Sequence, residues 1–144
     1  MRINIMLFSL FFLPSVLMAG EINTDRKNIA IDGYDALAYH LQNKAVKGVS
    51  KFSIEWKGAV WYFSSSEYKE LFKENPEEYA PLYGGHCANG LSDRHKVYGN
   101  PEIWLLQEGE LFFFYSRRGR RAWIAETDTK RQQADEYWRL VQFD

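Results

Sequence analysis

The sequence predicts a small single-domain α+β protein, in which two β-hairpins pack against short helices and a C-terminal helix. Two apolar runs are each interrupted by a two-residue turn that contains glycine, which is typical of hairpins. Serines that can cap helices follow both runs, and apolar residues recur at helical spacing near the C-terminus. No strand–helix–strand alternation is present, so a doubly wound parallel sheet is not expected.

The first twenty residues predict a secretory signal peptide. Arg2 is followed by an almost wholly apolar run, Ile5 to Ala19, which is too short for a transmembrane helix. We therefore expect residues 1–20 to be removed, residues 21–28 to be a flexible N-terminus, and residues 29–144 to fold. The protein would be periplasmic or secreted, with no stable membrane insertion after cleavage; the alternative is an uncleaved N-terminal anchor.

In the first part of the folded region, helix and strand signals follow one another closely. Asp35 can cap a short helix. Apolar and polar residues alternate over 52–56, turn residues occupy 57–58, and an apolar return strand spans 59–63. Ser64 then begins a helix with a capping-box pattern.

The second part contains another hairpin, with strands at 103–107 and 110–115, and a loop is expected over 89–101. Ser116 can cap the helix that follows. One buried stripe is predicted on the C-terminal helix, formed by Ala134, Tyr137, Trp138 and Val141. The sequence shows no internal repeat.

The net charge and the cysteine count exclude some classes of partner and of covalent cross-link. The chain has 18 Lys and Arg against 19 Asp and Glu, so its net charge of −1 argues against nucleic acid as a partner. A single cysteine, Cys87, rules out an internal disulfide.

Short motifs follow in order along nearly the whole chain after the leader. They are Ala30–Asp35 with Ala38-Tyr39; Ala45–Gly48; Phe52, Trp56, Gly58, Trp61 and Phe63; Phe72, Asn75–Glu77 and Tyr79–Pro81; Tyr83–Gly85 with Cys87-Ala88; Gly99–Pro101 with Trp104; Gly109, Leu111 and Tyr115-Ser116; and Trp123 and Trp138. In this order they resemble the secreted single-domain branch of the YHS-domain family.

The resemblance implies an α+β fold related to treble-clef-like, metal-associated modules. Metal-binding relatives carry cysteines just after the first hairpin and at the start of the next helix. This chain has Ser64, Ser65, Ser66 and Tyr68 there. Hydroxyls are poor ligands for zinc and copper(I), so a metal site would have to be built around Cys87.

The stretch from Tyr83 to Cys87 is the principal candidate site, and Tyr83, Gly84, Gly85 and Cys87 are its expected ligand pocket. The two glycines can bend the backbone and present the thiol. The neighbouring His86 is less informative than it looks, because adjacent side chains on an extended chain point in opposite directions.

The candidate metal ligands are Cys87, His86 and His95, with copper as the candidate metal. A structural zinc site is not expected, because it usually takes four Cys or His ligands and this chain has one Cys and three His. The alternative for Cys87 is a small apolar core residue, and for the histidines ordinary loop positions.

A basic cluster precedes the predicted C-terminal helices and consists of Arg117, Arg118, Arg120 and Arg121. Guanidinium groups beside free helix amides can bind an anion. The alternative is a solvated basic face.

The leading hypothesis from sequence is an exported binding module of YHS type, non-catalytic, that holds a metal ion or small ligand near Cys87. One alternative is a thiol-based redox or transfer enzyme that uses Cys87. The other is a protein-interaction module in which Cys87 is purely structural.

Overall fold

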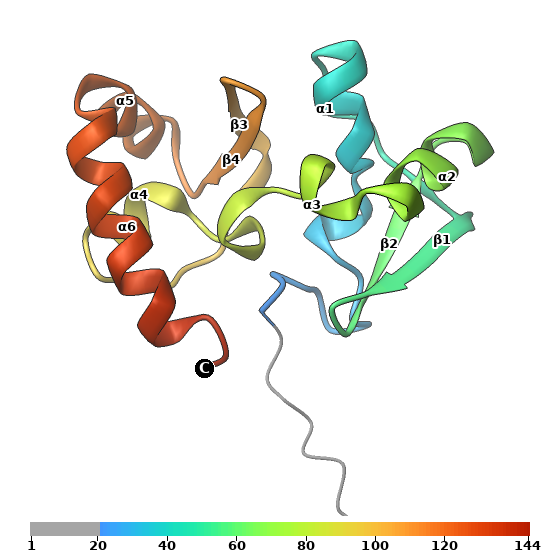
Figure 1. Cartoon of the computed structure of the whole chain (residues 1–144), viewed down its shortest axis with the longest axis horizontal. Helices are drawn as coiled ribbons and strands as arrows, with labels where there is room; N and C mark the ends of the chain where they lie inside the picture. The colour runs from blue at the N-terminus through green and yellow to red at the C-terminus, as the bar shows by residue number, and fades with distance from the viewer. Residues whose placement is uncertain (1–20) are drawn as a thin grey trace, which may run out of the picture.

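A computed structural model describes residues 21–144, so the predicted signal peptide at 1–20 lies outside the described residues. The elements in chain order are the 3-10 turn η1 (Ile31–Gly33), α1 (Ala36–Gln42), β1 (Val49–Trp56), β2 (Ala59–Phe63), α2 (Ser66–Glu74), α3 (Pro76–Tyr79), the 3-10 turn η2 (Leu82–Gly85), α4 (Ala88–Ser92), β3 (Asn100–Gln107), β4 (Glu110–Phe114), α5 (Arg117–Ala125) and α6 (Thr127–Val141). The predicted α+β class with two hairpins is confirmed (Figure 1). Across residues 21–144, no helix combines the length and apolar character needed to cross a bilayer.

Both hairpins turn where the sequence predicts. β1 pairs antiparallel with β2, and β3 with β4. Lys57-Gly58 and Glu108-Gly109 form the connections, and all four residues have positive φ. Two consecutive left-handed residues give a turn whose twist matches that of the flanking strands, which explains a glycine at the second position.

The two halves of the described chain repeat the same order of elements, although the sequence shows no internal repeat. A 3-10 turn, a short helix, a hairpin and a helix occur in that order from η1 to α2, and again from η2 to α5 (Figure 1). Each hairpin breaks register at the same place, between Val49 and Ser53 in one half and between Asn100 and Trp104 in the other. The repeat is not visible in the sequence, because the two halves share an order of elements but have different side chains at most equivalent positions.

Equivalent positions also cap equivalent helices. Ser65 accepts a hydrogen bond from Tyr68 N, and Ser116 accepts one from Gly119 N, each over the first turn after its hairpin. The predicted cap at Ser116 is confirmed. The predicted cap at Ser64 is wrong by one residue, because Ser64 instead donates to Asp35 from both its backbone N and its hydroxyl.

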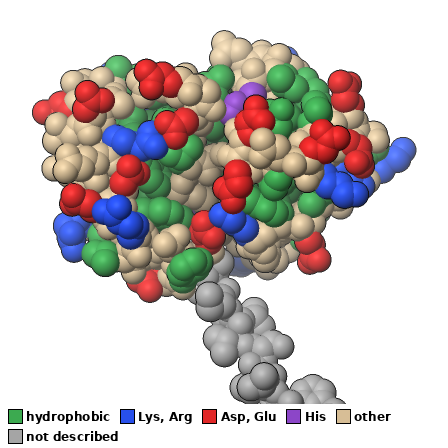
Figure 2. All heavy atoms as spheres, viewed as in Figure 1, with side chains coloured by type: hydrophobic (Ala, Val, Ile, Leu, Met, Phe, Trp, Pro, Cys, Tyr) green, Lys and Arg blue, Asp and Glu red, His purple; other side chains and the backbone are tan. Residues whose placement is uncertain are grey.

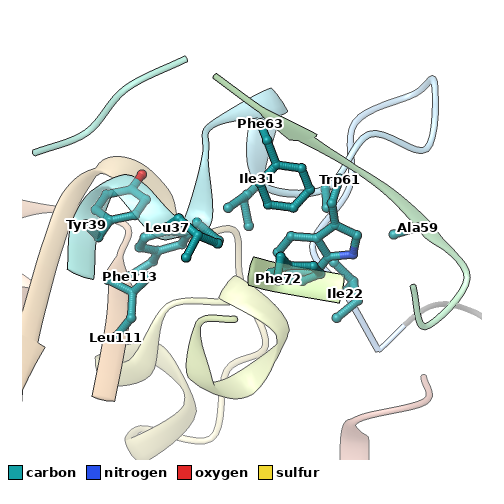
Figure 3. Close-up of a cluster of buried hydrophobic side chains, with 12 residues drawn as sticks. Ile22, Ile31, Leu37, Tyr39, Ala59, Trp61, Phe63, Phe72, Leu111 and Phe113 are labelled. Carbon is teal, nitrogen blue, oxygen red and sulfur yellow. The ribbon is translucent and has the colours of Figure 1, made fainter. Parts of the chain in front are cut away.

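Strand β4 joins the two halves of the core. Leu111 and Phe113 enter a cluster with residues of α1 and β2, which Figure 3 draws. Phe112 and Phe114 enter a second cluster with the C-terminal helices. Because neighbouring strand residues point to opposite faces, a continuous aromatic run is needed to fill both.

The second cluster contains the predicted stripe of α6. Ala134 is fully buried, and Tyr137, Trp138 and Val141 pack around it. The cluster is centred on Trp123, which contacts the rings of Phe112 and Phe114. In the first half, Phe72 makes the equivalent contacts with Trp61 and Phe63.

Trp123 carries a buried Nε1 that has no hydrogen-bond partner among the described residues. We expect Trp123→Phe to change the free energy of unfolding by less than about 1 kcal/mol, because removing an orphaned donor, which costs about 1–3 kcal/mol, offsets the lost apolar burial. The matched control is Trp61→Phe, since Trp61 Nε1 donates to Trp56 O at 3.1 Å. That change should cost about 2 kcal/mol in urea denaturation, and equal losses in the two variants would contradict the assignment.

The segment 21–28, predicted to be flexible, is held between the halves. Ile22 is buried, and Asn23 N donates to Gly84 O at 2.7 Å. The side-chain amide of Asn23 also donates to the carbonyls of Gly85 and Gly99. These bonds bind the N-terminal segment directly to the candidate site.

Candidate functional site

The backbone from Tyr83 to Cys87 is a left-handed bend that leads into a helix. Tyr83, Gly84 and Gly85 all have positive φ, of 58°, 60° and 84°. Cys87 then becomes the N-cap of α4, a short helix inside the segment where the sequence predicts only a loop. Residues 88–92 contain asparagine, glycine and serine, which are weak helix formers, so propensity gives no sign of α4.

Cys87 is both a core residue and part of a pocket wall. It is 3% exposed and packs in the second core cluster. Its Sγ accepts a hydrogen bond from Gly90 N at 3.3 Å, and its backbone N donates to Val97 O at 2.9 Å. The thiol is therefore fixed in position by the cap.

An open pocket of about 440 Å³ lies beside this cap, and we call it the Cys87 pocket. Its lining residues are Cys87, Asn89, Gly90, Asp93, His95, Val97, Tyr115, Ser116 and Gly119. It brings together two of the predicted ligands, Cys87 and His95. Val97 and Tyr115 are exposed at 40% and 65%, so the pocket presents apolar surface to solvent. Sequence reasoning missed both residues, and only the repeat could have indicated them.

The same place in the first half is closed. Asp35 is the counterpart of Cys87: it caps α1 and is fully buried. Its carboxylate accepts from Leu37 N at 2.9 Å, Ser64 N at 2.8 Å and Ser64 Oγ at 2.6 Å. The counterpart of Ser64 is Tyr115, whose side chain lies outward. In the first half, the two bonds from Ser64 to Asp35 join the end of the hairpin to α1, and the second half lacks equivalent bonds.

His86 points away from the Cys87 pocket. Its Nδ1 lies 2.9 Å from Tyr83 O, and its ring packs against Trp138 with centroids 5.7 Å apart. The structure therefore separates His86 from Cys87 and His95. Burial lowers the pKa of His86 below its usual 6.5, the bond to Tyr83 O acts in the opposite direction, and Lys96 lowers the pKa further.

This shift predicts acid sensitivity. Because the folded pKa lies below the unfolded value of 6.5, the unfolded chain binds the proton first, and the free energy of unfolding falls as the pH drops below about 6.5. Burial lowers the pKa of His40 in the same direction. NMR titration of the His86 ring should give a midpoint below 6.5, and His86→Asn should reduce the loss of stability between pH 7 and 5.5. A midpoint at or above 6.5 would contradict the buried environment.

The other predicted pocket residues lie elsewhere. Tyr83 and Gly84 line a smaller pocket of about 190 Å³ between the halves, together with Trp56 and Trp138. Tyr83 OH donates to Asp135 at 2.8 Å, and burial, followed by this bond, raises the pKa of Tyr83. Gly85 faces the core, where an added Cβ would lie 2.8 Å from Ile31. The stretch from Tyr83 to Cys87 thus contributes to two separate surfaces.

The four arginines lie at the start of α5. Arg117, Arg118 and Arg121 are exposed, whereas Arg120 donates to Trp104 O at 3.2 Å. Basic groups oppose the dipole at a helix N-terminus. Acidic and basic side chains are interspersed on the face seen in Figure 2, consistent with the small net charge.

The described residues do not form a site with several protein ligands for a metal ion. Within residues 21–144, no group of three or more His, Cys, Asp or Glu side chains is placed to hold one. A site with three or four protein ligands therefore does not fit. Cys87 and His95 line one pocket and are the only two predicted soft donors that the described structure brings to a common surface.

Comparison with known proteins identifies one region. Residues 37–83 match the family model of the YHS domain. Searches of curated proteins and of solved structures gave no match. The matched region runs from α1 to η2, which is most of the first half, and the second half repeats its fold.

Proposed function

Residues 37–83 match the family model of the YHS domain, and from this match we propose that the chain is an exported, non-catalytic binding module that holds a small ligand in the Cys87 pocket. The apolar leader at residues 5–19 supports export. In this proposal the first half of the chain, which contains the matched region, is a scaffold, and the second half forms the ligand site.

The observation that carries the proposal is the difference between the repeats. Asp35 closes the first half by accepting three hydrogen bonds, one from Leu37 N and two from Ser64. Cys87 and Tyr115 leave an open pocket of about 440 Å³ at the same place. This volume lies in the range of roughly 300–1,000 Å³ that is usual for ligand sites. A protein that needed only a stable fold could have kept the closed arrangement.

The lining indicates the ligand class. Val97 and the ring of Tyr115 offer apolar contact, Cys87 forms the wall, and His95 supplies one imidazole at the rim. Asp93 is partly neutralised by Lys130 at 3.5 Å. A small, uncharged, mainly apolar molecule suits these surroundings better than a strongly charged one.

A metal version of the proposal involves copper(I) held by Cys87 and His95, with an external ligand completing the coordination. Copper(I) prefers soft thiolate and imidazole donors. Anaerobic purification of residues 21–144 followed by metal analysis tests this version. Stoichiometric copper in the unmodified protein that is lost in Cys87→Ser would support copper binding. Absence of copper from the unmodified protein and from the variant would refute it.

Phenol is a suitable probe of the small-ligand version. We expect saturable NMR shifts at the backbone amides of Gly90, Val97 and Gly119, because all three line the pocket. Val97→Trp should abolish these shifts by filling the pocket with an indole. Val49→Trp is the matched control, since Val49 is similarly exposed, at 47%, but lies on β1 outside the pocket. Shifts that survive Val97→Trp would refute the assignment.

The two alternative functions have separate tests. A redox or transfer enzyme would need reagents to reach Cys87 Sγ, so iodoacetamide should modify the folded protein nearly as fast as the unfolded one.

An interaction module would bind its partner through the arginines of α5, and such binding would weaken strongly with salt. The buried cap position of Cys87 supports the binding module over the enzyme.

A further inference from the structure

The first half has a pocket of its own, of about 290 Å³, between β1 and α2. We call it the α2 pocket, and its lining residues are Ile54, Glu55, Trp56, Lys69, Phe72, Lys73 and Pro76. None of these residues lines the Cys87 pocket. The two pockets are therefore independent sites.

Its inner wall is aromatic. Trp56 and Phe72 meet edge to face, with ring centroids 5.6 Å apart. Phe72 is fully buried, whereas Trp56 is only half-buried and is the ring that a ligand can reach. Ile54 and Pro76 complete an apolar surface of the kind that holds a small hydrocarbon or aryl group.

Two lysines also line the α2 pocket. Lys69 and Lys73 are one helical turn apart, so both ammonium groups lie on the same side of α2. Neither forms an ion pair with another residue of the 21–144 region. The contrast is Lys57, which lies over the Trp56 ring and is paired with both Glu21 and Glu77. Glu55 contributes one carboxylate to the pocket, leaving an excess of positive charge.

The second half does not conserve this arrangement. The positions equivalent to Trp56, Lys69 and Lys73 are Gln107, Arg120 and Ile124. Arg120 donates to the backbone of β3, and Ile124 has no charge. The combination of an indole and two ammonium groups thus belongs to the first half alone and is not required by the shared fold.

We propose that the α2 pocket binds a small amphipathic carboxylate, with its aromatic or short aliphatic body against Trp56 and its carboxylate between Lys69 and Lys73. The apolar wall provides burial, and the lysines provide charge-assisted hydrogen bonds to the carboxylate. This site is separate from the proposed function of the Cys87 pocket.

Benzoate is the probe, and benzyl alcohol is its uncharged counterpart. We expect benzoate to shift the indole N–H resonance of Trp56 in NMR spectra of residues 21–144. Because exposed ion pairs are worth little individually, the double substitution Lys69→Gln with Lys73→Gln should weaken benzoate binding about 5-fold. Lys44→Gln is the control, since Lys44 is exposed and lies outside the pocket.

Three outcomes would overturn the proposal: equal binding of benzyl alcohol and benzoate, unchanged benzoate binding in the double variant, or benzoate shifts centred on the arginines of α5. Circular dichroism verifies the folding of each variant. Cys87→Ser should leave benzoate binding unchanged. Altered benzoate binding in Cys87→Ser would show that the two pockets are coupled and would contradict their independence, whatever the result with phenol.

Discussion

Replacing Asp35 by alanine should lower the free energy of unfolding by about 3–5 kcal/mol, because it leaves one buried and one partly buried backbone donor without an acceptor. Those donors are Leu37 N and Ser64 N, which lie 2.9 Å and 2.8 Å from the carboxylate. The residue is fully buried, so water cannot replace the lost acceptor without opening the structure. Such a loss is a large part of the stability of an ordinary small domain, about 5–15 kcal/mol.

Ser65→Ala is the matched control for Asp35→Ala. Ser65 also caps a helix, accepting from Tyr68 N at 3.1 Å, but it is only half-buried and has a single bond to lose. Its removal should cost about 1 kcal/mol. Urea denaturation followed by tryptophan fluorescence measures both variants. Similar losses would show that Asp35 acts as a simple helix cap and does not join the hairpin to α1.

The sequence predicts the hairpins well because their signals are local. The alternation over 52–56 and the glycines at 58 and 109 depend only on neighbouring residues, and so does the cap at Ser116. The repeat could not be predicted in this way. It is a property of backbone geometry, and equivalent positions such as Asp35 and Cys87, or Phe72 and Trp123, hold chemically different side chains.

The candidate site was predictable in part. The presence of one cysteine directs attention to Cys87, and the alternation rule anticipates that His86 points elsewhere. The placement of Cys87 and His95 in one pocket lining depends on α4, after which the chain folds back so that His95 N donates to Gly90 O at 2.8 Å. Tyr115 is the counterpart of Ser64, and it is exposed where the second half has the Cys87 thiol in place of the Asp35 carboxylate that holds Ser64. Neither feature has a signal in the local sequence.

Gly84→Ala should be among the most damaging single substitutions in the described chain, at about 4 kcal/mol or more. A Cβ at Gly84 would overlap Glu21 O and would lie 2.8 Å from Glu21 C, and both of these are backbone atoms. The N-terminal segment would have to move away, and the bond from Asn23 N to Gly84 O would be lost with it.

Gly109→Ala separates this steric effect from backbone strain. Gly84 and Gly109 both have positive φ, of 60° and 78°, so alanine is strained at either position. At Gly109, however, no atom lies within 4 Å of the added Cβ, and the substitution should cost only about 1–2 kcal/mol. Urea denaturation gives the two losses, and amide hydrogen exchange at residues 22–24 reports whether the N-terminal segment detaches. Equal losses, with exchange unchanged in Gly84→Ala, would mean that the segment does not hold the two halves together at the bend before Cys87.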